Sequence, residues 1–197
     1  MPRTSAQNQE IKAKRKSEIV NASLKMYATH GYKALRIDMI TAEAKCSHGL
    51  FYHYFKDKKG CLIGIHEEYL SKLDSLPPIN LAYSLGGIRG LKVIFDYVEN
   101  LYKADENEIY AFQIINDINS ETSAPSQVRS WAEEYDLRKA LVYLLNQGQQ
   151  SNEIIAGDIN LIADTLIELI NLNLIKAINK NKKVLPADLY LAFALKR

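Results

Sequence analysis

Apolar residues recur along nearly the whole chain at the three- and four-residue spacing of an α-helix. Ile37, Ile40 and Ala44, for example, share one face. No stretch alternates apolar and polar residues over more than a few positions, and no internal repeat is evident. The pattern predicts an all-α fold. The expected helices cover about Gln9–His30, Ile37–Ala44, His48–Tyr54, Lys58–Leu73, Ser84–Lys103, Glu106–Asn119, Ser126–Gln147, Asp158–Asn179 and Pro186–Lys196.

Glycine and polar residues mark several of the expected helix ends. Gly31 is predicted to be the C-cap of the first helix. Gly148 and Asp158 are predicted to be the C-cap and the N-cap on the two sides of one connection. The stretch 1–10 is polar and is expected to be a frayed tail, although it could instead follow DNA if the chain binds DNA.

A length of 197 residues allows one or two domains with ample core. Pro77–Pro78 breaks the chain and marks the expected domain boundary. The expected organisation is a first domain over residues 1–60, a connecting helix over 58–73, and a second helical domain over 74–197.

Residues 37–59 contain two short helical patterns joined by the turn Lys45–Cys46–Ser47. The hydroxyl of Ser47 can accept a hydrogen bond from the first turn of the second helix. A three- or four-residue turn between two short helices is the signature of the DNA-binding helix-turn-helix. The second helix, about His48–Tyr54, would then lie in the major groove with its first residues facing bases.

Aromatic and basic residues cluster at the end of this segment. A single aromatic residue at helical spacing is more often core, and we expect Phe51 and Phe55 to be buried. The four residues 52–55 are all rings, however, so they point to all sides of a helix and cannot all be buried. The exposed rings and the lysines at 56, 58 and 59 suit base edges and phosphates.

The positive charge is concentrated in the same part of the chain. Residues 1–60 contain twelve Lys and Arg and five Asp and Glu, a net charge of +7. The whole chain carries +2, so residues 61–197 carry −5. A solvated basic face is the alternative, but its overlap with a helix-turn-helix favours a nucleic-acid surface.

The segment Ile19–Leu62 resembles the DNA-binding domain of the TetR family of bacterial transcriptional regulators. The matching motifs are MYATHGY, IDMI and CSHGLFYHYFKDK. The resemblance implies an all-helical homodimer with three DNA-binding helices and a second domain for effector binding and dimerisation. It implies that the dimer reads a pseudo-palindromic operator in double-stranded DNA, and acts as a repressor that a small-molecule effector releases. The DNA-binding residues expected on this basis are Arg36, Ser47, His48, Gly49, Leu50, Tyr52, His53, Tyr54 and Lys58.

The sequence departs from the family pattern at several positions of this segment. Lys45 replaces the usual turn glycine, so we expect a non-glycine residue with positive φ there. Leu50 replaces a small polar residue, which favours an apolar contact such as one to a thymine methyl group. Asp38 stands where a basic residue is frequent. These changes affect the expected operator sequence.

The helix at 158–179 is apolar on most of its circumference, and the last helix is apolar on several faces. A symmetric interface between two copies would cover both helices. The alternative is an internal core helix followed by a mobile tail. The dimer-interface residues expected are Leu166, Leu169, Ile170, Leu174, Leu189 and Phe193.

An effector pocket is expected within the second domain, lined by aromatic residues and by polar residues on otherwise apolar helices. Each aromatic residue could equally be ordinary core. A fully packed second domain would instead favour a DNA-binding regulator without a small effector, controlled by a protein partner. The candidate ligand-binding residues are Phe95, Tyr102, Tyr110, Phe112, Gln113, Asn116, Trp131, Tyr135 and Tyr143.

We expect no enzymatic activity, because the chain has no Ser/His/Asp or Cys/His grouping and no phosphate-binding glycine loop. No metal-ligand set or cofactor is expected. The two cysteines, Cys46 and Cys61, fit a reducing cytoplasm, and a redox role for Cys46 is the less favoured reading. The most apolar helix contains charged residues, so no membrane span is expected.

Overall fold

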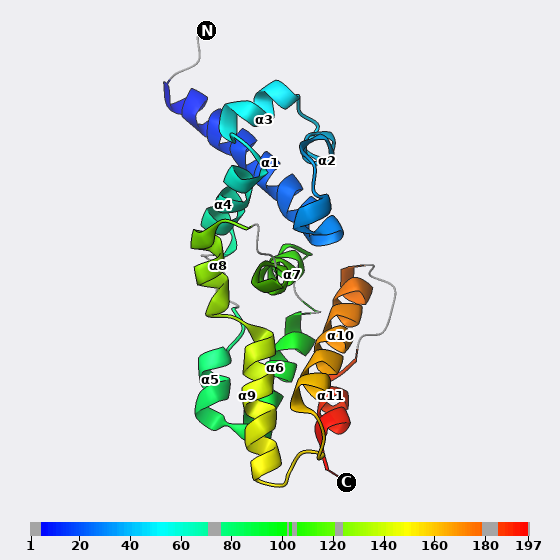
Figure 1. The fold of residues 1–197 in the computed structure, drawn as a ribbon. Coiled ribbons are helices and arrows are strands. Elements are labelled where there is room, and N and C mark those ends of the chain that lie inside the picture. Colours follow the sequence, from blue (N-terminus) through cyan, green and yellow to red (C-terminus); the bar gives the residue numbers. More distant parts are fainter. Residues whose placement is uncertain are drawn as a thin grey trace. The chain divides into compact units, whose positions relative to one another are not determined.

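The computed structural model describes residues 5–70, 76–101, 103, 106–120, 124–178 and 185–196 (Figure 1). All regular elements among these residues are α-helices, as predicted, and the one β-bridge joins Ile154 to Leu195. The helices are α1 (Ser5–Ala34), α2 (Ile37–Glu43), α3 (His48–Tyr54), α4 (Lys58–Glu68), α5 (Ile79–Leu85), α6 (Gly87–Leu101), α7 (Glu106–Ser120), α8 (Ser126–Glu133), α9 (Leu137–Gln150), α10 (Ile159–Ile178) and α11 (Ala187–Ala194).

The chain forms two compact units. Unit 1 comprises Met1–Asp74 and Asp117–Ala132, and unit 2 comprises Ser75–Asn116 and Glu133–Arg197. The division passes through α7, whose last residues belong to unit 1. The predicted boundary near Pro77–Pro78 lies beside the first of these divisions. The assignment of roles to the two expected domains stays a prediction.

In unit 1, α1 packs against α2 and α4. Gly31 has φ 73° and ψ 161°, so the long helix ends at His30 and a further turn follows it. This confirms the predicted C-cap, because a positive φ is readily adopted by glycine. The buried side chains that hold α1–α4 together include Ile19, Leu24, Tyr27, Ile40, Phe51, Leu62 and Ile65.

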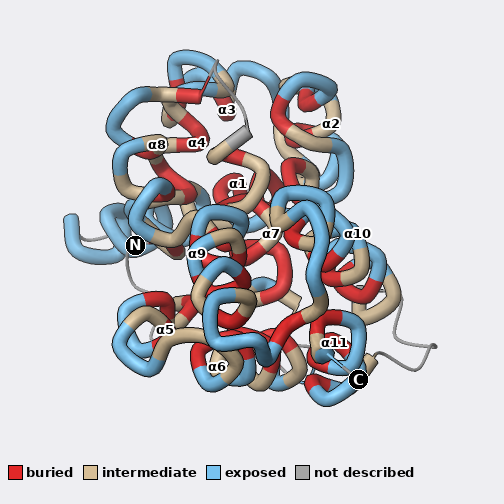
Figure 2. The backbone as a smooth tube through the Cα atoms, turned by 60° about the horizontal axis from the view of Figure 1, so that its bottom comes forward, coloured by how far each residue is buried: buried red, intermediate tan, exposed pale blue. Residues whose placement is uncertain are grey.

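Unit 2 is a bundle in which α6 contacts α5, α9 and α11, and α9 also contacts α10. Its buried residues (red in Figure 2) lie on the inner sides of these helices, and exposed ones (pale blue) form the outer sides. Gly90 lies where α5, α6 and α9 meet. A Cβ atom at Gly90 would lie 2.5 Å from the Ala82 carbonyl oxygen and 2.5 Å from a Leu144 methyl group.

Two expected helices are each divided in the structure. The helix predicted over 84–103 is interrupted after Leu85, because Gly86 and Gly87 adopt φ of 65° and 46°. The helix predicted over 126–147 is interrupted after Glu133, and Asp136 begins a new helix by accepting a hydrogen bond from the Lys139 N–H. Each of these two predicted helices is therefore a pair of shorter helices in the structure.

The connection between α9 and α10 tests the two predicted caps. Asp158 accepts hydrogen bonds from the N–H groups of Asn160 and Leu161, which confirms it as the N-cap of α10. Gly148 is not a C-cap, because α9 continues through it to Gln150. Ile154 packs so closely on Gly148 that a Cβ there would lie 2.4 Å from the Ile154 side chain. The glycine therefore serves close packing rather than helix termination.

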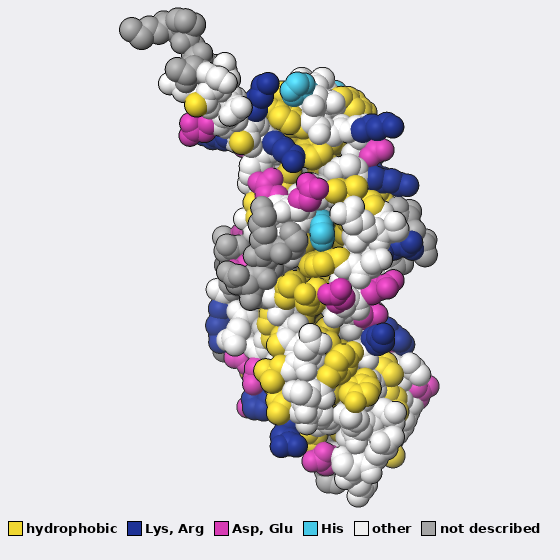
Figure 3. Space-filling model, turned by 90° about the vertical axis from the view of Figure 1, so that its left-hand side faces the viewer, with side chains coloured by type: hydrophobic (Ala, Val, Ile, Leu, Met, Phe, Trp, Pro, Cys, Tyr) yellow, Lys and Arg dark blue, Asp and Glu magenta, His cyan; other side chains and the backbone are white. Residues whose placement is uncertain are grey.

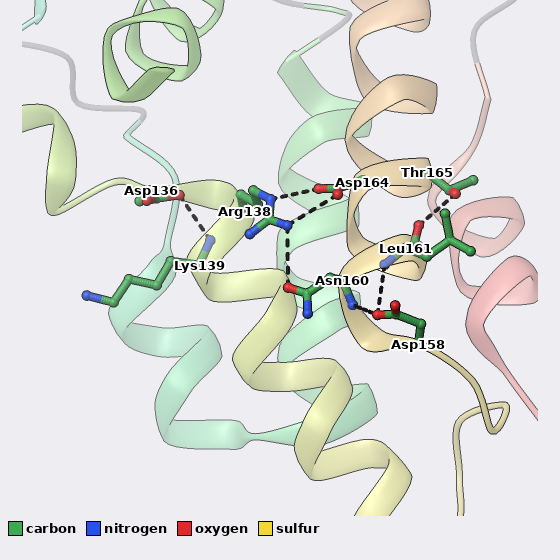
Figure 4. Close-up of polar contacts among 8 residues, drawn as sticks. All are labelled: Asp136, Arg138, Lys139, Asp158, Asn160, Leu161, Asp164 and Thr165. Carbon is green, nitrogen blue, oxygen red and sulfur yellow. Dashed lines mark hydrogen bonds and ion pairs between the residues drawn. The ribbon is translucent and has the colours of Figure 1, made fainter. Parts of the chain in front are cut away.

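Arg138 of α9 connects that helix to α10 (Figure 4). Its Nε donates to Asp164 Oδ1 at 2.7 Å and its Nη2 to Asp164 Oδ2 at 3.2 Å. The second nitrogen also donates to Asn160 Oδ1 at 3.4 Å. This two-point pairing holds the pKa of Asp164 below its usual value. It fixes the start of α10 against α9 on the outer surface of unit 2.

Among the described residues, no helix is both long enough and apolar enough to span a membrane.

Candidate nucleic-acid interface

The turn between α2 and α3 has the geometry that the sequence predicts. Lys45 has φ 48°, so a lysine occupies the left-handed conformation expected there. The Cys46 N–H donates to the Thr41 carbonyl at 3.0 Å and closes the turn. The Ser47 hydroxyl accepts from the Leu50 N–H at 3.1 Å, which confirms the predicted N-cap. These contacts fix the direction in which α3 begins.

Helix α3 is anchored on one side by two aromatic rings. Phe51 is fully buried and Phe55 nearly so, and their ring centroids lie 5.8 Å apart. Both were predicted to be core. The Lys16 ammonium of α1 lies 5.9 Å from the centre of the Phe55 ring. The two rings therefore anchor α3 within unit 1, and the Phe55 ring lies next to Lys16 of α1.

The opposite side of α3 faces outward. His48, Gly49, Tyr52 and His53 are exposed, and Leu50 and Tyr54 are half-buried. Tyr52 is 54% exposed and rests edge-on against the Phe51 ring at 5.6 Å. Exposed aromatic and imidazole side chains on a capped, anchored helix can donate to base edges and phosphates. The sequence-predicted residues of α3 are therefore brought together on one surface.

Asp38 of α2 lies beside the first residue of α3. The distance between His48 Nε2 and Asp38 Oδ1 is 3.8 Å, and both side chains are mostly exposed. The two groups form an ion pair when the imidazole is protonated. Sequence reasoning had noted Asp38 only as standing where a basic residue is frequent. It had missed this pair, whose members are separated by nine residues. Arg36, also predicted to contact DNA, is exposed at the N-cap of α2.

Lys58 is the predicted DNA contact that the structure places inward. Its ammonium donates to the Tyr32 carbonyl at 2.9 Å and to the Leu35 carbonyl at 3.4 Å. It also lies 4.5 Å from the centre of the Tyr32 ring. Lys58 thus binds carbonyls at the end of α1 and in the following loop, a structural role that sequence reasoning missed. A phosphate contact for Lys58 stays a prediction.

Neither cysteine has the environment of a reactive thiol. Burial raises the pKa of Cys61 to about 11, and its thiol donates to the Ser23 hydroxyl at 2.9 Å. Burial also raises the pKa of Cys46, which the charge of Arg15 lowers to a smaller extent. A raised pKa disfavours the thiolate that oxidation and nucleophilic attack require. Within the described part of the chain, no cluster of three potential metal ligands is present.

The structure disperses the predicted ligand-binding residues. Phe95 is buried and stacks on Tyr190 at 5.2 Å, and Tyr110 and Phe112 are also buried. Trp131 belongs to unit 1, where its ring meets His66 edge-on at 4.9 Å. Tyr135 is half-buried on the unit 2 core. Tyr102 lies outside the described residues.

Two polar residues of that set have incompletely satisfied amide groups. The Gln113 Oε1 and Asn116 Nδ2 atoms are buried and find no hydrogen-bond partner among the described residues. The two residues lie three apart on α7, on one face of that helix. Buried polar atoms normally have partners, so these amides can receive polar groups of a ligand or water.

Tyr143 lies in a groove that sequence reasoning did not predict. It meets Tyr83 edge-on at 5.0 Å across a groove of about 720 Å³ between α5 and α9. Sixty residues separate the two tyrosines, and no local sequence signal connects them. The pKa of Tyr83 is raised, mainly by burial and to a smaller extent by the charge of Asp136.

The predicted dimer-interface residues fall into two groups. Leu166, Ile170 and Leu174 are buried in the core of their own unit, and Leu169 is partly buried against it. Leu189 and Phe193 of α11 are exposed. The first group is therefore not available to a second chain in this fold, and the opposite stripe of α10 is the exposed one. Its exposed apolar residues are Leu161, Leu172 and Ile175.

A short anchored helix with an N-cap, a tight turn before it and an exposed polar face defines a helix-turn-helix DNA-binding protein. Residues 19–65 match the sequence profile of the family described as "Bacterial regulatory proteins, tetR family". Residues 19–65 are therefore similar to the DNA-binding domain of this family, as the motifs indicate.

Comparison with individual proteins agrees with this assignment. The chain is 35% identical over 57 residues to the Transposon Tn10 TetC protein of Escherichia coli, a match that spans 29% of the length of each protein. Two solved structures share its fold over most of its length. HlyIIR, a hemolysin II transcriptional regulator, gives a TM-score of 0.59 at 15% identity, covering 94% of this chain and 99% of its own. A TetR-like regulator from Rhodococcus sp. RHA1 gives 0.58 at 17% identity, covering 98% and 95%.

Proposed function

We propose that the protein is a dimeric transcriptional repressor that binds a pseudo-palindromic operator and is released from it by a small molecule. The observation that carries the proposal is the outward face of α3. There His48, Tyr52 and His53 are exposed on a helix that Ser47 caps and Phe51 anchors. This surface belongs to a domain of a family of DNA-binding regulators.

The proposed contacts divide by position on α3. His48, Leu50 and His53 would lie nearest the base edges, since a recognition helix enters the major groove with its first turns. Leu50 supplies an apolar surface suited to a thymine methyl group. Tyr52 and Tyr54 would donate to phosphates. Gly49 has no side chain and lets the DNA backbone approach closely.

A second copy of the chain would complete the DNA-binding unit. One short recognition helix contacts few base pairs, whereas a two-fold dimer places two such helices about 34–36 Å apart on one face of DNA. The apolar stripe of α10 and the exposed Leu189 and Phe193 of α11 provide surface for this association. Twofold association is the commonest arrangement of soluble homo-oligomers.

The small molecule is proposed to bind in unit 2, where Gln113 and Asn116 have amide atoms in need of partners. A ligand can move the protein off its operator only if it binds one conformation of the dimer more tightly than the other. The DNA-bound state would be the one that the ligand disfavours. Helix α4, which follows the recognition helix, is the proposed element through which unit 1 responds.

Selection of bound sequences from a random double-stranded DNA pool at physiological salt tests the proposal. The expected product is an inverted repeat whose half-sites are centred about one helical turn apart. Enrichment of a single half-site would contradict the dimer. Absence of any enriched sequence would contradict sequence-specific binding itself.

Thermal denaturation with a library of small molecules tests the effector separately. A ligand of unit 2 should raise the Tm of the free protein and lower its affinity for the selected operator. The variant Gln113→Leu/Asn116→Leu should lose the response while keeping operator binding. A protein that binds its operator but responds to no small molecule would favour the alternative, a regulator controlled by a protein partner.

A further inference from the structure

Helix α1 begins well before the part of unit 1 that it packs against. Residues 5–15 are exposed, and the first buried residue of α1 is Ile19. At 1.5 Å per residue, the eleven exposed residues extend about 16 Å along the helix axis. In Figure 3 this end of the chain projects from the domain, with Lys and Arg side chains (dark blue) near its base. We call residues 5–16 the α1 extension.

The α1 extension has the composition of a surface that meets a charged partner. Its sequence, SAQNQEIKAKRK, contains three lysines and one arginine against one glutamate, a net charge of +3. Ile11 is its one large apolar residue, so it presents no apolar stripe for an apolar groove on another protein. A polar, cationic helix that projects from a DNA-binding domain complements a polyanion.

One side of the extension borders an acidic groove. Lys14 and Lys16 line this groove between α1 and α4 together with Glu67 and Glu68. These carboxylates would repel phosphates on that side. Lys12 lies two residues before Lys14, about 200° around the helix, and therefore points away from this groove.

Lys16 lies at the edge of that groove and also reaches the end of α3. Lys16 is one turn after Lys12 and contacts the Phe55 ring at the end of α3. Lys56, exposed, follows Phe55 directly in the chain. Lys12, Lys16 and Lys56 thus supply cations between the α1 extension and the end of the recognition helix.

We propose that Lys12 and Lys16 bind phosphates of the DNA that flanks each half-site, so that the α1 extension lengthens the footprint beyond the helix-turn-helix. An extension of about 16 Å corresponds to about 5 base pairs at 3.4 Å each. The inference rests on the proposed DNA-binding function, and adds contacts that the helix-turn-helix alone does not make.

The salt dependence of operator binding tests the proposal with a matched control on the same helix. In Lys12→Gln/Lys16→Gln, a dimer loses four phosphate contacts, and the slope of log K against log salt should fall by about 3.6. Its affinity deficit relative to the unmodified protein should then widen by about 100-fold between 200 and 50 mM salt. Lys14→Gln should leave the slope unchanged, and Lys12→Arg/Lys16→Arg should restore it.

Operators of two lengths locate the contacts. For the unmodified protein, shortening the duplex from six flanking base pairs to none on each side should weaken binding; for Lys12→Gln/Lys16→Gln it should have little effect. The inference would be overturned if all variants showed the same slope of log K against log salt. It would also be overturned if shortening the duplex weakened binding of the unmodified protein and of Lys12→Gln/Lys16→Gln equally. Neither result would contradict operator binding itself. Failure of the proposed function is distinguishable, because the unmodified protein would then select no operator at all. Unchanged Tm values would exclude a folding defect.

Discussion

At the scale of single residues, Tyr52 and His53 are neighbours on α3 with different expected tasks. Tyr52 is exposed, and its ring rests edge-on against the buried Phe51 ring. His53 is exposed near the end of the helix. The first is suited to a phosphate oxygen and the second to a base edge.

Substitutions of the two residues distinguish a phosphate contact from a base contact. Tyr52→Phe should weaken binding to the operator and to random DNA by the same factor, about 10-fold or more per subunit, because a hydrogen bond to a charged phosphate contributes about 1.5–3 kcal/mol. His53→Ala should weaken operator binding about 10-fold per half-site, the cost of one base contact, and affect random DNA little. Fluorescence anisotropy with both duplexes measures the two effects. A selective loss in Tyr52→Phe would move that residue from phosphate to base recognition.

Asp117, in the last part of α7, is a half-buried carboxylate whose titration affects stability. Burial raises its pKa from 3.8 to about 6. A group whose folded pKa is raised stabilises the fold below its unfolded pKa, and that contribution is lost as pH rises through the folded pKa. The ionised side chain should therefore reduce stability above pH 6.

The substitution Asp117→Asn tests this sign, because asparagine keeps the shape without the charge. At pH 7.5 the Tm should rise by about 2–4 °C, equivalent to about 1 kcal/mol for a chain of this size. At pH 4 the difference should shrink towards zero. Glu133→Gln, which removes an exposed carboxylate in α8, should change the Tm by less than a degree or so at either pH. A lower Tm for Asp117→Asn at pH 7.5 would contradict the sign.

At the scale of helices, packing in unit 2 depends on close approach at Gly90. A methyl group there would meet both the Ala82 carbonyl oxygen and Leu144. Gly90→Ala should therefore destabilise the protein by about 1–3 kcal/mol through overpacking. Gly60→Ala in α4 is the matched control, since the nearest atom to its Cβ would be the Asp57 carboxylate at 3.7 Å. It should be neutral or stabilise by up to about 1 kcal/mol. Chemical denaturation measures both, and equal effects would mean that α5, α6 and α9 can separate slightly at no cost.

Local signals explain which elements could be predicted from the sequence. The turn at Lys45–Ser47 and the cap Asp158 each depend on a few adjacent residues, and the structure confirms them. The break at Gly86–Gly87 also had a local signal, but the apolar periodicity on both sides outweighed it in the prediction. For the site, the exposed face of α3 followed from four consecutive rings that could not all be buried.

Contacts between distant residues could not be predicted in the same way. Lys58 has the type and position of a phosphate ligand, and only the folded chain shows the carbonyls of Tyr32 and Leu35 beside it. Helix α10 is apolar on nearly every side, so its sequence does not reveal which stripe faces the core. The packing of Leu166 and Ile170 on their own unit decides this.

At the scale of the whole molecule, an apolar surface remains on unit 2 after its core is formed. Leu161, Leu172 and Ile175 of α10 recur at helical spacing, and they are 66%, 49% and 52% exposed. Leu189 and Phe193 lie one turn apart on α11. Exposed apolar residues that form stripes, rather than isolated points, indicate an association surface.

Charge placed in the middle of this surface tests whether it joins two chains. Leu172→Glu/Ile175→Glu should give a monomer in sedimentation equilibrium, because four carboxylates would face one another across a two-fold axis. The Tm of the monomer should report only the loss of association, since both side chains are exposed in the single chain. Leu81→Glu/Leu85→Glu, an exposed apolar pair on α5, is the control and should leave the dimer intact.

Loss of the proposed dimer interface should also change DNA binding. A monomer contacts one half-site, so Leu172→Glu/Ile175→Glu should lose at least about 100-fold in affinity for the inverted repeat and bind an isolated half-site as well as before. A variant that stays dimeric would place the interface on another surface of unit 2. A monomer that keeps full operator affinity would mean that the two half-sites are read independently, and that the spacing of the repeat is set by the DNA rather than by the protein.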